Sequence, residues 1–163
     1  MTVEKFMTKN VRTCCETGTL ADAAQLLWEA DCGCIPVLSA DDSNRVVGIV
    51  TDRDICMATH FRGSAPGGIA VADVMSTVIC SVSPSASVAD AEALMRDAQV
   101  RRLPVVDSEQ KLVGVVSLAD LARGTNGRAK KDGPTTKGVS ETFRAISAPR
   151  AAVTAAAPVA KAS

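Results

Sequence analysis

Aromatic side chains are nearly absent from this sequence of 163 residues. The four that occur are Phe6, Trp28, Phe61 and Phe143, and there is no tyrosine. Proteins that bind single-stranded nucleic acid stack bases on aromatic side chains, so this composition argues against a nucleic-acid partner. Hydrophobic residues nevertheless make up 47% of the chain, which is enough to build a compact core.

Long apolar runs are also missing. No segment approaches the roughly 20 apolar residues of a membrane span, and residues 1–10 lack the apolar run of a signal peptide. We therefore expect a cytoplasmic protein with no membrane partner. Its charges balance overall, but the segment from Gly124 onward carries seven Lys/Arg and two Asp/Glu, so the tail is basic and the remainder acidic.

The single histidine, His60, belongs to no recognised hydrolase motif with a serine or cysteine nucleophile. We assign no catalytic residue and expect no enzyme activity. The six cysteines, in a chain without an export signal, are expected to be reduced thiols that mostly serve as small core residues. Cys32, Cys34 and Cys56 together with His60 offer zinc-type ligands, but their spacing is not that of a standard zinc motif, so we predict no metal site.

The chain contains an internal duplication. Residues 3–38 align without gaps on residues 71–106, and residues 46–54 align on residues 112–120. Identical pairs at matched positions include Val3 and Val71, Asp22 and Asp90, and Pro36 and Pro104. One unit of this size is too small to bury its own sheet face, so we expect two motifs, residues 1–66 and 67–124, to pack about a pseudo-twofold axis.

Each copy reads as strand, helix, strand, strand, helix, an α/β (α+β) unit. The helical spacing of apolar residues behind Thr19 and Ser87, two natural N-caps, predicts the first helix of each copy. Two apolar runs separated by turn-forming residues predict a hairpin. The predicted strands lie near Thr13 and Ser81, at 34–38 and 46–50, and at 103–106 and 112–116, and the second helices begin at Thr51 and Ser117.

Residues 125–163 have a composition rich in Gly, Lys, Pro and Ala that cannot support a packed core, so we expect this tail to be mostly disordered. Val139, Phe143 and Ile146 are the exception, because they follow helical spacing behind Ser140, a candidate cap. They predict a short helix over 139–147 that docks on the body.

The start of the second helix in each copy is the place where chemistry is most expected. A hydroxyl beside free backbone N–H groups suits a phosphate, and a carboxylate one turn later can accept both hydroxyls of a ribose. Thr51 with Asp54, and Ser117 with Asp120, have this arrangement. The same spacing also defines a capping box and recurs at residues 19 and 22 and at residues 87 and 90, so spacing alone favours neither reading.

Segments 47–54, 71–76, 100–107 and 114–120, taken together, resemble a tandem pair of cystathionine beta-synthase (CBS) domains, a Bateman module of the stand-alone bacterial type. The resemblance covers residues 3–124. It implies a cleft on each side of the pseudo-twofold axis for an adenosine-containing ligand such as AMP, ADP, ATP, S-adenosylmethionine or NAD, with no cofactor required. It also implies a homodimer in which two modules form a flat disk through their helices, consistent with unused apolar positions at Leu26, Leu94 and Leu118.

The resemblance also assigns roles to residues. Asp54 and Asp120 match ribose-binding aspartates, and Thr51 and Ser117 match hydroxyls near phosphate. Arg102 matches an arginine that reaches phosphate in the nucleotide-sensing subunit of AMP-activated protein kinase, whereas the first motif has Cys34 at that position.

Two sets of candidate nucleotide-binding residues follow from this resemblance. The first cleft is expected to contain Thr13, Cys32, Gly33, Ile35, Arg102, Val115, Ser117 and Asp120. The second cleft is expected to contain Ser81, Val100, Arg101, Leu103, Ile49, Thr51, Arg53 and Asp54.

The leading hypothesis is a non-catalytic regulatory module that binds a nucleotide and signals to an effector protein that the sequence does not identify. One alternative is a structural or dimerisation module with empty clefts, in which Thr51, Asp54, Ser117 and Asp120 act only as caps. A further alternative is a metal or redox sensor that uses its cysteines.

Overall fold

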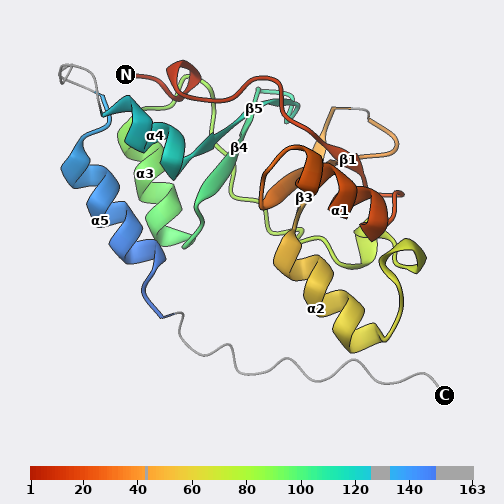
Figure 1. The fold of residues 1–163 in the computed structure, drawn as a ribbon. Helices are drawn as coiled ribbons and strands as arrows, with labels where there is room; N and C mark the ends of the chain where they lie inside the picture. The colour runs from red at the N-terminus through yellow and green to blue at the C-terminus, as the bar shows by residue number, and fades with distance from the viewer. Residues whose placement is uncertain (43, 126–132, 150–163) are drawn as a thin grey trace.

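The computed structural model describes residues 1–42, 44–125 and 133–149. Its elements form two similar halves, so the expected mixed α/β fold built from two copies is confirmed (Figure 1). The first half contains β1 (Cys14–Cys15), α1 (Leu20–Glu29), β2 (Cys34–Leu38), β3 (Val46–Thr51) and α2 (Asp52–Arg62). The second contains α3 (Val88–Asp97), β4 (Arg102–Val106), β5 (Leu112–Ser117) and α4 (Leu118–Gly124), and is followed by α5 (Thr136–Ile146).

All four repeat helices begin with a capping box. In α1, the Asp22 backbone N–H donates to Thr19 Oγ1 at 3.3 Å, and the Thr19 N–H donates to Asp22 Oδ2 at 3.0 Å. The same reciprocal bonds occur at the starts of α2, α3 and α4. These bonds satisfy backbone donors that the first helical turn leaves without partners, so the predicted helix starts at Thr51 and Ser117 are confirmed.

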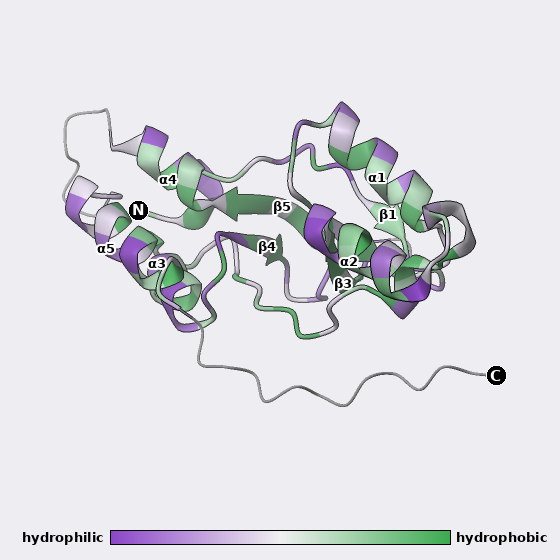
Figure 2. Ribbon diagram, turned by 60° about the horizontal axis from the view of Figure 1, so that its bottom comes forward, coloured by the Kyte–Doolittle hydropathy of each residue, from purple (hydrophilic) through white to green (hydrophobic). Residues whose placement is uncertain are grey.

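The strands pair as two antiparallel hairpins. β2 pairs with β3, and β4 pairs with β5. Each hairpin has a register shift at the matched position, between Val37 and Leu38 in the first copy and between Val105 and Val106 in the second. Figure 2 shows β3, β4 and β5 as strongly hydrophobic, as expected for strands that form the centre of each half.

The strand predicted near Ser81 is reduced to a single parallel bridge between Val82 and Val105. In the first copy, β1 is extended by the Glu16 backbone N–H, which donates to the Leu38 carbonyl at 3.1 Å. Pro84 occupies the matched position in the second copy and has no N–H to donate. The pairing therefore stops one residue earlier.

Two hydrophobic cores form, and each contains a segment from the other copy. Val3, in the 3-10 helix Val3–Lys5, is fully buried in the core of the second copy. Val71, in the 3-10 helix Val71–Asp73, is fully buried in the core of the first copy. Figure 1 shows the N-terminal segment beginning beside the second half and then crossing to the first. The boundary between residues 66 and 67 therefore separates the two motifs in the sequence, but each hydrophobic core contains residues from both motifs.

The exchanged segments continue across the strands of the other copy. Thr8 and Val115 exchange backbone hydrogen bonds of 2.9 and 3.0 Å, and Ser76 and Ile49 exchange bonds of 2.9 and 3.0 Å. Gly114 and Gly48 lie beside these crossings. A Cβ at Gly114 would lie 2.8 Å from the Thr8 carbonyl oxygen, and one at Gly48 would lie 2.5 Å from the Met75 sulfur.

We predict that Gly114→Ala destabilises the protein more than Gly48→Ala. The added methyl group at Gly114 meets backbone that is fixed by hydrogen bonds, whereas at Gly48 it meets the flexible end of a methionine side chain. Overpacking of this kind costs about 1–3 kcal/mol. Urea unfolding of both variants measures the difference, and equal losses would contradict the proposed role of the Thr8 backbone.

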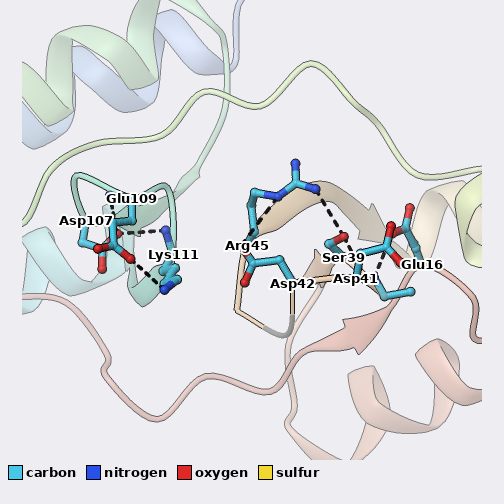
Figure 3. A network of polar contacts seen from close by, with 9 residues as sticks. Glu16, Ser39, Asp41, Asp42, Arg45, Asp107, Glu109 and Lys111 are labelled. Atoms are coloured by element: carbon cyan, nitrogen blue, oxygen red, sulfur yellow. Dashed lines mark hydrogen bonds and ion pairs between the residues drawn. The ribbon is translucent and has the colours of Figure 1, made fainter.

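The turns of the two hairpins lie next to each other and are joined by backbone bonds. The Leu112 N–H donates to the Asn44 carbonyl at 2.9 Å, and the Asn44 side chain donates to the Leu112 carbonyl at 3.2 Å. Figure 3 shows the polar contacts that shape each turn, which include Arg45 bonded to Ser39 and Lys111 paired with Glu109. The two sheets are thus connected at their turn ends as well as by the exchanged segments.

Helix α5 packs against α3 and α4, so the predicted docking of this helix occurs. It begins at Thr136 rather than 139, because Thr135, and not Ser140, caps it by accepting the Gly138 N–H at 3.0 Å. Val139 and Ile146 pack against the second core, but Phe143 is 58% exposed and Thr142 is buried in its place. The expected disorder concerns mainly residues 126–132 and 150–163, which lie outside the described residues.

Glu92 on α3 is buried under α5, and among the described residues its Oε1 accepts no hydrogen bond. Burial raises the pKa of this carboxyl group above its usual range, with Arg96 opposing and Glu141 reinforcing the effect. The folded protein therefore holds this proton to a higher pH than the unfolded chain does. Stability from the protonated group is complete at low pH and is lost as the pH rises through the raised pKa.

We predict that Glu92→Gln is more stable than the parent at neutral pH by about 1 kcal/mol, since it removes a buried, unsatisfied charge. The advantage should shrink as the pH falls and Glu92 becomes protonated. Asp90→Asn on the same helix is the control with opposite sign, because hydrogen bonds from Ser87 lower the pKa of Asp90. Its loss of stability should be largest at neutral pH and fade in acid. Melting curves of both variants and the parent, recorded across pH, measure these effects. If the two variants show the same pH dependence of stability, the assigned roles of Glu92 and Asp90 are wrong.

Candidate functional site

A cleft of about 790 Å³ opens between the two motifs. One wall comes from the first motif, where β2 begins, β3 ends and α2 begins. The other wall comes from the second motif, from residues 99–102, Pro104 and Val115 and from the segment 76–80 that precedes α3, and Ile146 of α5 also lines the cleft. The volume lies in the range of small-molecule and cofactor sites.

Thr51 and Asp54 lie on the first wall and are bonded to each other. The Thr51 N–H and hydroxyl donate to Asp54 Oδ2 at 2.9 and 2.7 Å, and the Asp54 N–H donates to Thr51 Oγ1 at 3.1 Å. The described hydrogen bonds to this carboxylate all end on Oδ2. Asp54 can thus cap α2 with one oxygen while its other oxygen accepts hydroxyl groups of a ligand.

Three arginines bring positive charge to the cleft: Arg53, Arg101 and Arg102. Within the part of the chain that the structure describes, none of them forms an ion pair with a carboxylate. The cleft also contains Asp52 and Asp54, both on the first wall. An anionic ligand would therefore meet guanidinium groups that are not held in ion pairs with the described carboxylates.

The two motifs also approach each other in the cleft at Gly33. A Cβ at this position would lie 3.6 Å from Asp52 Oδ2 and 3.8 Å from Arg102 Nη1. The neighbouring Cys34 thiol has its pKa raised by burial, an effect that the adjacent Arg102 guanidinium partly offsets. Cys34 is the residue of the first motif that aligns with Arg102 of the second. The first motif has no arginine at this position, and Arg102 of the second motif lies beside it instead.

The structure brings together residues that the family resemblance assigns to two separate clefts. From the second predicted set it gathers Ile49, Thr51, Arg53, Asp54, Val100 and Arg101, and from the first it adds Gly33, Arg102 and Val115. The remaining predicted residues do not line this cleft: Thr13, Cys32, Ile35, Ser81, Leu103, Ser117 and Asp120. Ile35 and Leu103 are fully buried core residues, because the strand alternation turns their side chains inward.

Asp120 lies in a different environment from Asp54. Its Oδ2 accepts the capping bonds of Ser117, as Asp54 does for Thr51, but its Oδ1 is paired with Arg123. Both carboxylate oxygens of Asp120 therefore have partners within the protein, so the geometry favours Asp54 as the carboxylate for a ligand.

Several lining residues were not predicted. Ser76, Val78 and Cys80 come from the segment of the second motif that precedes α3, Gln99 follows α3, and Ile146 is the last residue of α5. The backbone pairing of Ser76 with Ile49 places the first group at the cleft. The repeat contained a signal for this pairing, since Ser76 matches Thr8, but nothing in the sequence shows which strand the segment crosses.

The alternative sites find less support. No group of three or more His, Cys, Asp or Glu side chains suitable for a metal ion occurs among residues 1–42, 44–125 and 133–149. Cys32 lies near the Cys34 carbonyl, with a sulfur-to-oxygen distance of 3.5 Å, whereas Cys56 is exposed on α2. In this described portion of the chain, no helix has the length and hydrophobicity needed to cross a membrane.

Comparison with known sequences identifies the two halves. The CBS domain pattern matches residues 3–60 and 71–126. The chain belongs to the CBS domain family. The CBS domain-containing protein YhcV of Bacillus subtilis is 41% identical over 120 residues, which span 74% of this chain and 82% of that protein. Hypoxic response protein 1 of Mycobacterium tuberculosis is 37% identical over 122 residues, 75% of this chain and 83% of that one.

Solved structures of CBS proteins have the same fold. A crystal structure of Hypoxic Response Protein I with two coordinated zinc ions matches with a TM-score of 0.68 and 34% identity, covering 76% of this chain and 98% of that one. The structure of CBSX2 in complex with AMP matches with a TM-score of 0.64 and 29% identity, covering 75% and 93%. The expected relationship to stand-alone CBS domain pairs is thus confirmed.

Proposed function

We propose that this chain is a non-catalytic regulatory module that binds an adenosine-containing nucleotide in the cleft between its two CBS motifs. The observation that carries the proposal is the convergence of Arg53, Arg101 and Arg102 on a cleft that also contains Asp54. Guanidinium groups bind phosphate through charge-assisted hydrogen bonds, and a carboxylate accepts from ribose hydroxyls.

AMP is the first candidate ligand, since the related CBSX2 has been crystallised with AMP. ADP, ATP, S-adenosylmethionine and NAD share its adenosine and are kept as alternatives. Because the cleft walls come from both motifs, a bound nucleotide would link them and change how firmly they are held together. That change is the signal we propose is passed to an effector protein, with the module acting as a homodimer in the cytoplasm.

We predict that at least one of these five compounds raises the melting temperature of the protein. A ligand at 100 times its dissociation constant stabilises the folded state by about 2.7 kcal/mol. Thermal unfolding with and without each compound measures the effect. If none of them shifts the melting curve, the module has a structural role and the boxes at Thr51 and Ser117 act only as caps.

We predict that Asp54→Ala weakens nucleotide binding by at least about tenfold, because charge-assisted hydrogen bonds to the ribose contribute roughly 1.5–3 kcal/mol each. Isothermal titration with the nucleotide that stabilises the parent protein measures the loss.

Asp22→Ala is the matched control for this variant. Asp22 accepts from the Thr19 hydroxyl at 2.7 Å, the same distance as at Asp54, but Asp22 does not line the cleft. Both variants lose a capping box, and only Asp54→Ala should lose affinity. Asp120→Ala tests the other predicted ribose site, and equal affinities in all three variants would show that Asp54 does not contact the ligand.

A further inference from the structure

Helix α5 lies outside both repeats, since the CBS domain pattern ends at residue 126 and α5 spans Thr136–Ile146. Figures 1 and 2 show it beside α3. Each motif has its hairpin and its two helices without α5, so this helix is an addition to the family fold. Its role therefore depends on the contacts that it makes in this chain.

The contacts between α5 and α3 include polar groups that a permanent core would avoid. Near the start of α5, a Cβ at Gly138 would lie 2.7 Å from Glu92 Oε2, and among the described residues Glu92 Oε1 accepts no hydrogen bond. Further along, Thr142 is fully buried, and its Oγ1 accepts a bond of 2.9 Å from Arg96 Nη1. Leu118 of α4, an apolar position expected at an interface between modules, is by contrast a core residue that is 6% exposed. A helix docked over an unsatisfied carboxylate separates from the body at a lower free-energy cost than the core helices do.

The last turn of α5 meets the nucleotide cleft. Ile146, its final residue, lines the cleft together with Val100 of the second motif. Gln99 also lines the cleft, and its side-chain amide donates to the carbonyls of Ala145 and Ala148 at 3.2 Å. One residue of the cleft wall thus holds the end of the helix, and one residue of the helix forms part of the wall.

The link through Gln99 is specific to the second motif. Gln99 has a left-handed backbone conformation with φ 49°, and Asp31, the residue aligned with it in the first motif, has φ 46°. The repeat therefore sets the same turn after the first helix of each copy. An amide can donate to the carbonyls at a helix end, whereas an ionised carboxylate only accepts, so the first motif has no equivalent of this contact.

We propose that α5 forms part of the nucleotide site and that its docking on the second motif is coupled to ligand binding. Ile146 supplies apolar surface for the adenine base. The cleft of about 790 Å³ exists with α5 docked, so a ligand can contact Ile146 without displacing the helix. Bound nucleotide therefore strengthens the docking of α5, and an empty cleft lets it separate more readily. This coupling rests on the nucleotide binding proposed above, with α5 as the element whose state reaches an effector protein.

We predict that releasing α5 weakens nucleotide binding. Thr142→Arg places a second guanidinium group beside Arg96, at a fully buried position that does not line the cleft. The dissociation constant should rise by about fivefold or more, as is typical of coupled sites. Isothermal titration measures it with AMP, or with whichever of the five adenosine compounds binds the parent protein most tightly. Phe143→Arg is the matched control, because it adds the same charge at the neighbouring position, which is 58% exposed, and it should bind like the parent. Melting curves establish that both variants are folded.

The reciprocal effect is measured on the parent protein and needs no variant. The saturating nucleotide should slow amide hydrogen exchange over residues 136–146 by a factor similar to the affinity loss in Thr142→Arg, because two coupled events share one free energy. Exchange in α1, which contributes no residue to the cleft, should change less. In Thr142→Arg without ligand, fast exchange over the same residues verifies that α5 is released.

These measurements separate the coupling from nucleotide binding itself. Equal affinities of the parent and of Thr142→Arg with α5 released would overturn the coupling and leave the proposed function standing. Exchange over residues 136–146 that stays unchanged in a parent protein saturated with nucleotide would do the same. A parent protein that binds none of the five compounds would overturn both.

Discussion

The exchange of N-terminal segments between the two copies is the constraint on which the rest of this structure depends. Val3 completes the core of the second motif and Val71 completes the core of the first, and both side chains are fully buried. The core of each motif is therefore completed by a residue from the N-terminal segment of the other motif. A unit of this size would bury too little apolar surface alone, so the reciprocal exchange makes the pair, rather than the single motif, the stable unit.

The cleft is a product of the same exchange. The segment that follows Val71 pairs with β3 through Ser76 and then lines the cleft with Val78 and Cys80. Arg102 and Asp54, which belong to different motifs, face the same space only because these crossings fix one sheet against the other. A ligand held by both residues would add its binding free energy to the association of the two motifs. Regulation by binding alone is therefore physically reasonable here, without a catalytic step.

Local signals in the sequence predicted local structure well. Hydroxyl caps at Thr19, Thr51, Ser87 and Ser117 marked the helix starts, because capping depends on residues three positions apart. Contacts between the two motifs were harder to predict from the sequence. The family resemblance grouped Arg102 with Asp120, whereas in the structure Arg102 and Asp54 line the same cleft and Asp120 is paired with Arg123. Which residues of the two motifs line the same cleft depends on how the two sheets are oriented. The spacing of residues within one motif carries no information on that orientation.

The departures from symmetry are as informative as the repeat itself. The chain covers α3 with α5 and supplies Arg96 and Gln99 as hydrogen-bond donors for it, while the matched positions on α1 hold Trp28 and Asp31. An exposed indole costs hydration free energy in an isolated module, since no described segment covers it. Two motifs that began as copies have thus acquired different outer faces, one closed by the chain's own helix and one left apolar.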